Sequence, residues 1–91
     1  MQVRWLRKAL HNLEQAYEFV AETDIEAAAR TILEIQNAID LLETFPRIGR
    51  VGRVDNTREL VVTDTPYIVI YRLRGNTVEI IRILHTSMKY P

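Results

Sequence analysis

The spacing of apolar residues divides the chain into a helical first half and a strand-forming second half. Across Leu6–Val20, apolar side chains recur every three or four residues, which is the period of one face of an α-helix. A second such stripe covers Ala28–Phe45, and Pro46 ends it because proline cannot continue a helix. Thr23 and Asp24 precede the second stripe and offer capping oxygens. Two helices joined by so few residues must form an antiparallel hairpin.

The other segments have the patterns of β-strands. Gln2–Trp5 alternates apolar and polar residues ahead of the first helix. Pro46–Asn56 reads as a loop because of its proline and its glycines. After this loop the β-branched and aromatic runs predict three strands: Thr57–Thr63, Tyr67–Leu73 and Val78–His85. The turns between them are Asp64-Thr65-Pro66 and Gly75-Asn76, and Thr86–Pro91 forms a short tail.

These elements predict one α+β domain over residues 1–91, with the order β-α-α-β-β-β. Consecutive strands with short turns form a small, mainly antiparallel sheet, and the helical hairpin must pack on one of its faces. Such a four-stranded sheet leaves another face or an edge available to a partner. The aromatic residues expected in the core are Trp5, Tyr17, Phe45, Tyr67 and Tyr71.

Composition and charge narrow the classes of function. The 91 residues include no cysteine, which excludes a disulfide scaffold and a thiolate site, and the two histidines have no ligand-spaced neighbours. We therefore expect no metal and no cofactor. There is no apolar run long enough to cross a membrane and no signal peptide, so a cytoplasmic protein is expected.

The net charge of zero conceals two oppositely charged halves. Residues 1–46 carry four basic and eight acidic residues, a net charge of −4, whereas residues 47–91 carry eight basic and four acidic residues, a net charge of +4. Seven of those eight cations are arginine, which favours bidentate contact with carboxylate or phosphate. This half is either an ordinary mixed surface or a face for an acidic or phosphate-bearing partner.

Three segments of the second half resemble the RelE/ParE toxins. Residues 46–60, PRIGRVGRVDNTREL, are similar to the proline and Gly-Arg loop that leads into a strand in that family. Residues 67–71, YIVIY, resemble its middle strand, and residues 78–91, VEIIRILHTSMKYP, resemble its closing strand and tail. The resemblance covers essentially the whole chain and agrees with the predicted order of elements. It implies the toxin of a type II toxin–antitoxin module, neutralised by a cognate antitoxin. The basic second half of the chain predicts that the antitoxin has an acidic tail, which wraps around the toxin.

The family has two branches with different chemistry. Toxins similar to RelE cut mRNA on the ribosome, which requires a base, an acid and cations around one phosphate. The resemblance then gives the catalytic candidates Arg58, Arg82, His85 and Tyr90. Arg58 and Arg82 could hold phosphate, the imidazole of His85 could transfer a proton, and Tyr90 could stack on a base or donate a proton.

Strand alternation weakens this nuclease set. It places Arg82 on one face of the last strand with Val78, Ile80 and Leu84. His85 falls on the other face, unless a bulge or the strand end reorients one of the two residues.

Toxins similar to ParE poison DNA gyrase and do not need the nuclease residues. The chain has no net positive charge to hold ribosomal RNA, and its loop and its ending resemble ParE more than RelE. The gyrase branch is therefore favoured, and the residues expected to contact the target or partner are Arg50, Arg53, Arg58, Lys89 and Tyr90. Two alternatives remain open, an mRNA endoribonuclease acting with the ribosome and an inactive binding module that keeps the toxin fold.

Overall fold

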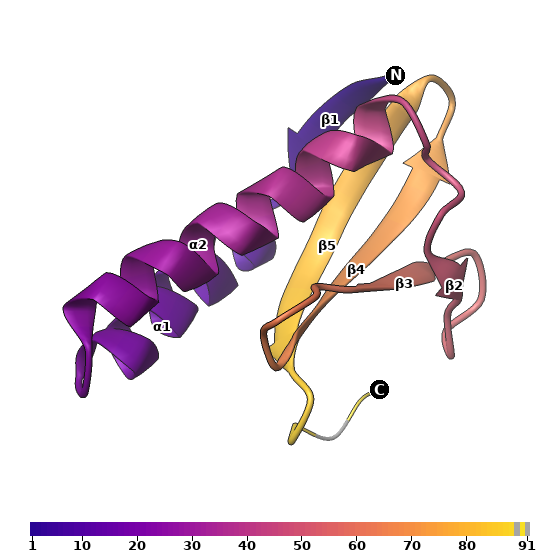
Figure 1. Ribbon diagram of the computed structural model, residues 1–91. Coiled ribbons are helices and arrows are strands. Elements are labelled where there is room, and N and C mark those ends of the chain that lie inside the picture. Colours follow the sequence, from indigo (N-terminus) through magenta and orange to yellow (C-terminus); the bar gives the residue numbers. More distant parts are fainter. Residues whose placement is uncertain (89, 91) are drawn as a thin grey trace.

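The computed structural model describes residues 1–88 and residue 90, arranged as a helical hairpin against one sheet (Figure 1). In chain order the elements are β1 (Gln2–Trp5), α1 (Arg7–Ala21), α2 (Ile25–Asp40), the 3₁₀ turn η1 (Leu41–Glu43), β2 (Arg50–Val51), β3 (Arg58–Val61), β4 (Tyr67–Arg74) and β5 (Thr77–His85). None of the helices in the described part of the chain is long and apolar enough to cross a membrane.

The sheet is mixed and has five strands in the order β1-β5-β4-β3-β2. β1 pairs in parallel with β5, and the other neighbours are antiparallel. The α+β class, the helical hairpin and the mainly antiparallel sheet are therefore confirmed. The prediction of an uninterrupted loop over Pro46–Asn56 is wrong at Arg50–Val51, which forms a short strand beside β3. Two paired residues are too few to give a recognisable period in the sequence.

The helices begin and end through local chemistry. Asp24 is the N-cap of α2, and its carboxylate accepts a hydrogen bond from the N–H of Ala27 at 3.0 Å, as the cap prediction requires. α2 ends at Asp40, and η1 continues it for a single turn. The chain therefore leaves helical geometry before Phe45, and the predicted continuous stripe is wrong over its last residues.

The main core lies between the hairpin and the sheet. Ile35 and Ile39 of α2 pack there with Tyr71 of β4, and all three are at most 2% exposed. The core placement of Tyr67 and Tyr71 is confirmed, and Trp5 packs partly buried against the same cluster.

Two of the aromatic core predictions are wrong, because Tyr17 is 40% exposed and Phe45 is 55% exposed. The hairpin extends past the end of the sheet (Figure 1), and Ala16 rather than Tyr17 belongs to the core cluster. Phe45 lies beyond the last helical turn, which ends at Glu43, so the helical spacing that predicted its burial does not apply there.

A register shift in β5 changes which of its residues face the helices. Ile70 of β4 is paired with Arg82 and the next residue, Tyr71, with Ile80, so Ile81 is an extra residue in β5. Beyond this bulge, Ile83 joins Val78 and Ile80 in the core cluster. The simple alternation predicted from the sequence, with Arg82 grouped with Val78 and Ile80, is therefore wrong.

The sheet face away from the helices is partly covered. Ile70 is 1% exposed and Leu84 is 5% exposed, yet neither belongs to the main core cluster. Both line a small hollow together with Arg53, from the loop between β2 and β3, and Tyr90, near the C-terminus. Tyr90 therefore lies over this face of the sheet.

Candidate functional site

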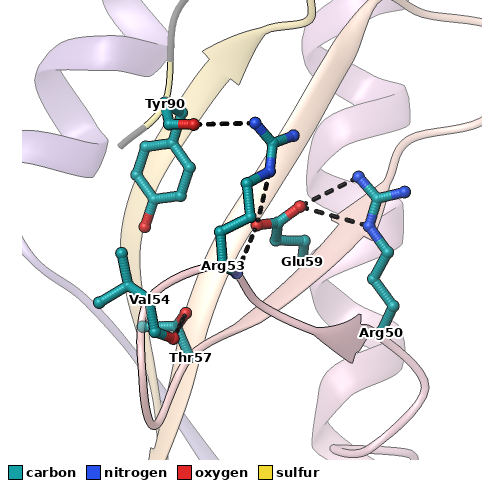
Figure 2. A network of polar contacts seen from close by, with 6 residues as sticks. All are labelled: Arg50, Arg53, Val54, Thr57, Glu59 and Tyr90. Carbon is teal, nitrogen blue, oxygen red and sulfur yellow. Dashed lines mark hydrogen bonds and ion pairs between the residues drawn. The ribbon is translucent and has the colours of Figure 1, made fainter.

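A buried carboxylate on β3 organises the arginine-rich loop (Figure 2). The side chain of Glu59 is 2% exposed, and one of its oxygens accepts hydrogen bonds from Nε and Nη2 of Arg50 at 3.3 and 3.0 Å. Its other oxygen accepts the backbone N–H of Arg53 at 3.1 Å and lies 3.5 Å from Nε of that residue. Because Arg50 is directly opposite Glu59 in the β2–β3 pair, this contact follows from the strand register.

The C-terminal tail joins the same group of residues. Nη1 of Arg53 donates to the backbone oxygen of Tyr90 at 2.8 Å, and the guanidinium carbon lies 5.9 Å from the centre of the Tyr90 ring. Glu59, Arg50, Arg53 and Tyr90 are called the Glu59 cluster below. It unites three of the five residues predicted for target or partner contact. Lys89, a fourth, lies outside the described residues.

The loop glycines stand at close approaches. A Cβ at Gly49 would lie 2.7 Å from the Tyr71 hydroxyl, and one at Gly52 would lie 2.2 Å from Oγ1 of Thr57. Both distances are too short for a side chain, so the loop requires glycine at each position. Each glycine is followed by one of the two arginines that reach Glu59. Both Gly-Arg pairs of the loop therefore place an arginine beside the same carboxylate, that of Glu59.

Tyr71 and Arg58 anchor the first part of the loop. The Tyr71 hydroxyl accepts the N–H of Gly49 at 2.9 Å and donates to the carbonyl of Pro46 at 2.8 Å. Burial raises the pKa of Tyr71, which keeps the hydroxyl proton that this second bond needs. Arg58 donates from Nη1 to the carbonyls of Gly49 and Arg47, at 2.8 and 3.2 Å. None of the ion pairs among the described residues involves Arg58.

The electrostatics of Glu59 are a balance of opposing effects. Burial alone would raise its pKa, but the hydrogen bonds from Arg53 and Arg50 and their positive charges outweigh burial, so the pKa of Glu59 is lowered from 4.5. The pKa of Glu79, on β5, is also lowered, chiefly by the hydrogen bond from Arg72 at 2.6 Å. Both carboxylates are therefore ionised at neutral pH.

Arg82 lies at a second place, between α1 and β5. Its Nε donates to the side-chain oxygen of Asn12 at 3.0 Å, and the same oxygen accepts the N–H of Ile83 at 3.2 Å. Both Arg82 and Asn12 line a hollow of about 630 Å³. We call it the α1–β5 hollow; its other lining residues include Lys8, His11, Phe19, His85 and Met88.

His85 is packed within this region. Its ring meets the Tyr67 ring edge-on at 5.3 Å and the Phe19 ring edge-on at 6.2 Å, and its Nδ1 accepts the N–H of Ser87 at 3.1 Å. Arg82 and His85 both line this hollow, although the register keeps them on alternate faces of β5 as expected, with Arg82 paired to Ile70 and His85 to Tyr67. The contact of the Arg82 side chain with Asn12 of α1 brings it to the hollow.

The comparisons with known proteins agree on one family. The family model described as "ParE toxin of type II toxin-antitoxin system, parDE" matches residues 3–90. The chain belongs to the ParE toxin family. The resemblance found in the sequence is thereby confirmed.

Individual relatives of this ParE-family chain cover nearly its whole length. It is 39% identical to the toxin Y4kP of Sinorhizobium fredii over 89 residues, covering 98% of this chain and 92% of that protein. It is 34% identical to Toxin RelE2 of Caulobacter vibrioides over 86 residues, or 94% and 96% of the two chains. A solved structure of the chromosomal ParDE toxin–antitoxin system from P. aeruginosa matches with a TM-score of 0.84 and 26% identity, over 93% and 95% of the chains.

Sequence reasoning missed two residues that hold arginines in place, one in the α1–β5 hollow and one in the Glu59 cluster. Asn12 was not singled out, although it stands three residues after Ala9 and four before Ala16, both buried, at the edge of the apolar stripe. Glu59 was not singled out either, although it is the one acid in the TRELVVT strand. A polar residue at an apolar spacing was the available signal in both cases. Among the described residues no cluster of three or more His, Asp or Glu side chains could hold a metal ion.

Proposed function

We propose that this chain is a toxin that poisons DNA gyrase in the cytoplasm and is held inactive by a cognate antitoxin. Membership of the ParE family supports the toxin role, and the structural relative from a ParDE system supports a protein partner. The preference for gyrase over mRNA as the target rests on the positions of the four nuclease candidates.

The observation that carries this choice is the separation of the nuclease candidates. Arg58 is bound to loop carbonyls, Arg82 and His85 line the α1–β5 hollow, and Tyr90 lies against Arg53. None of the three hollows that these residues line contains more than two of the four. Metal-independent RNA cleavage needs an acid, a base and cations around a single phosphate. The arrangement therefore favours a target bound by a surface over a substrate cut in a site.

The antitoxin part of the proposal is supported by charge and by the sheet edge. The half of the chain that forms β2–β5 carries a net charge of +4, which complements an acidic tail. β2 is the last strand of the sheet, and the described residues leave its outer edge unpaired. An antitoxin tail could add a strand there or lay a helix in a groove.

The test is controlled expression, with chromosome morphology, an SOS reporter and an intact reporter mRNA followed together. Filamentation with an SOS response and uncut message is the expected result. Purified protein should then inhibit supercoiling by gyrase. Arg50→Gln should weaken that inhibition at least about tenfold, because the loop loses a cation that its neighbours hold in place. Arg30→Gln, on the exposed face of α2, is the matched control and should inhibit like the unmodified chain.

Two other results would overturn the proposal. Message cut within the reading frame on ribosomes, with supercoiling unaffected, would establish the endoribonuclease alternative. An absence of both growth arrest and gyrase inhibition, in protein shown to be folded by circular dichroism, would leave the binding module.

A further inference from the structure

In the part of the chain that the structure describes, no carboxylate pairs with Arg82. Its Nε is held by a neutral amide, Asn12, and none of the ion pairs among the described residues involves it. By contrast, Arg72, another partly buried arginine of the sheet, pairs with Glu79 at 2.6 Å. A guanidinium beside a neutral amide keeps its positive charge and its outer N–H groups for a ligand.

The surroundings of Arg82 reinforce this charge. Lys8 and His11, from the first turns of α1, line the same hollow, and none of the residues that line it is acidic. Cations that share a concave surface raise the local potential more than the same charges on a flat one. The α1–β5 hollow is therefore selective for a negatively charged group.

Two of the exposed side chains that line the hollow are apolar. Phe19 is 61% exposed and Met88 is 54% exposed, and both line the hollow. A ligand that covers them as well as Arg82 must combine an anion with apolar groups. A nucleic acid fits poorly, because the helical half of the chain has a net charge of −4 and would repel a continuous phosphate backbone.

We propose that the α1–β5 hollow binds an acidic side chain, Asp or Glu, flanked by apolar residues in a partner protein segment. Arg82 pairs with the carboxylate through its outer nitrogens, Lys8 adds a second positive charge, and Phe19 and Met88 contact the flanking apolar side chains. Asn12 is a positioning residue, because its oxygen fixes the guanidinium through Nε and leaves the outer nitrogens facing the hollow. The identity of the natural segment rests on the proposed antitoxin, whereas the chemistry of the site does not.

The test uses nuclear magnetic resonance of the purified chain. The probes are acetyl-Leu-Glu-Leu amide, the matched peptide with Gln in place of Glu, and inorganic phosphate, each at millimolar concentration. The Glu peptide should shift the Nε–H of Arg82, the side-chain amide of Asn12 and the N–H of Ile83. It should bind at least about tenfold more tightly than the Gln peptide, which is the usual value of one charge-assisted pair.

Three variants test whether binding of the Glu peptide depends on the α1–β5 hollow. Asn12→Asp keeps both acceptor contacts, so it should fold, but its carboxylate neutralises Arg82 and should weaken Glu-peptide binding at least about tenfold. Lys8→Gln should weaken binding by a smaller factor. Arg30→Gln makes the same change in net charge as Asn12→Asp, and it lies outside the hollow, so it should bind like the unmodified chain.

The proposal is overturned by equal binding of the Glu and Gln peptides, by shifts elsewhere, or by full binding to Asn12→Asp. Tight binding of phosphate without binding of the Glu peptide would assign the hollow to a phosphate-bearing ligand instead. None of these readings depends on gyrase or on growth arrest. A chain that proves non-toxic can still bind the peptide, and a gyrase poison can still fail to bind it.

Discussion

The Glu59 cluster and the α1–β5 hollow hold their arginines in opposite ways. In the cluster, Arg50 and Arg53 share one buried carboxylate, so part of their charge is neutralised within the protein. In the hollow, Arg82 is held by the neutral amide of Asn12. The first arrangement fixes the shape of a loop, and the second leaves a charge available for a ligand.

This difference shows that counting arginines overestimates the surface available to a partner. The loop arginines stand out in the sequence, yet Glu59 and the Tyr90 backbone occupy much of their hydrogen-bonding capacity. Arg82 lies in an apolar strand and looks structural by comparison. The partner of an arginine, rather than its exposure, indicates whether its charge is available.

Removing the shared carboxylate should have the largest effect. Glu59→Ala should lower the free energy of unfolding by about 2–3 kcal/mol, because the Arg53 N–H loses its acceptor and two arginines lose their ion pair. The estimate is below that for a fully buried pair because both arginine side chains are more than half exposed. Urea denaturation measures the loss. Glu34→Ala, at an exposed position of α2, should change stability by less than about 0.5 kcal/mol.

Removing the hydroxyl that anchors the loop should have the next largest effect. Tyr71→Phe leaves the N–H of Gly49 and the carbonyl of Pro46 without their partner, which should cost about 2 kcal/mol. Thermal unfolding measures it, with Tyr17→Phe, at a more exposed tyrosine, as the control. Equal stabilities of the two variants would mean that Glu59 alone fixes the loop.

Acid should weaken the Glu59 cluster. The pKa of Glu59 is lower in the folded chain than its ordinary value of 4.5, so the unfolded chain binds more protons in this range. The stability from this group is fully present above pH 4.5 and is lost as the pH falls through the lower, folded pKa. Unfolding free energies measured from pH 7 downward should therefore fall less steeply in Glu59→Gln than in the unmodified chain. If the unfolding free energies of the two proteins fall in parallel with pH, the ion pairs of Glu59 contribute nothing to stability.

The smallest change in stability is expected when a negative charge is introduced beside Arg82 in the α1–β5 hollow. Asn12→Asp should raise the free energy of unfolding by no more than about 1 kcal/mol, because it adds an ion pair to Arg82 and loses only the 3.3 Å hydrogen bond that the Asn12 amide donates to Gln15. Calorimetry against Arg30→Gln measures the difference. A marked loss of stability would show that the amide donor of Asn12, which bonds Gln15 at 3.3 Å, matters more than its oxygen.

Most of the fold was predictable because its signals are local. The apolar spacing of the helices, the Asp24 cap and the Gly75-Asn76 turn each depend on residues close together in the chain. The bulge at Ile81 and the Asn12–Arg82 contact, across 70 residues, depend on how distant elements pack. Strand alternation correctly places Arg82 and His85 on alternate faces of β5, but it could not show that both line one hollow, because Arg82 reaches that hollow through its contact with α1.

The pairing of β1 with β5 has a consequence for synthesis of the chain. Gln2 is aligned with Thr77, so the first strand finds its only neighbour after the helices and all the other strands have been made. A growing chain that has not reached residue 77 can form its helical hairpin, whose contacts are local, but leaves the apolar face of the hairpin without a complete sheet. Such a chain presents an unfinished, aggregation-prone surface during translation. A chaperone, or a partner made at the same time, would therefore have the most to protect before β5 emerges.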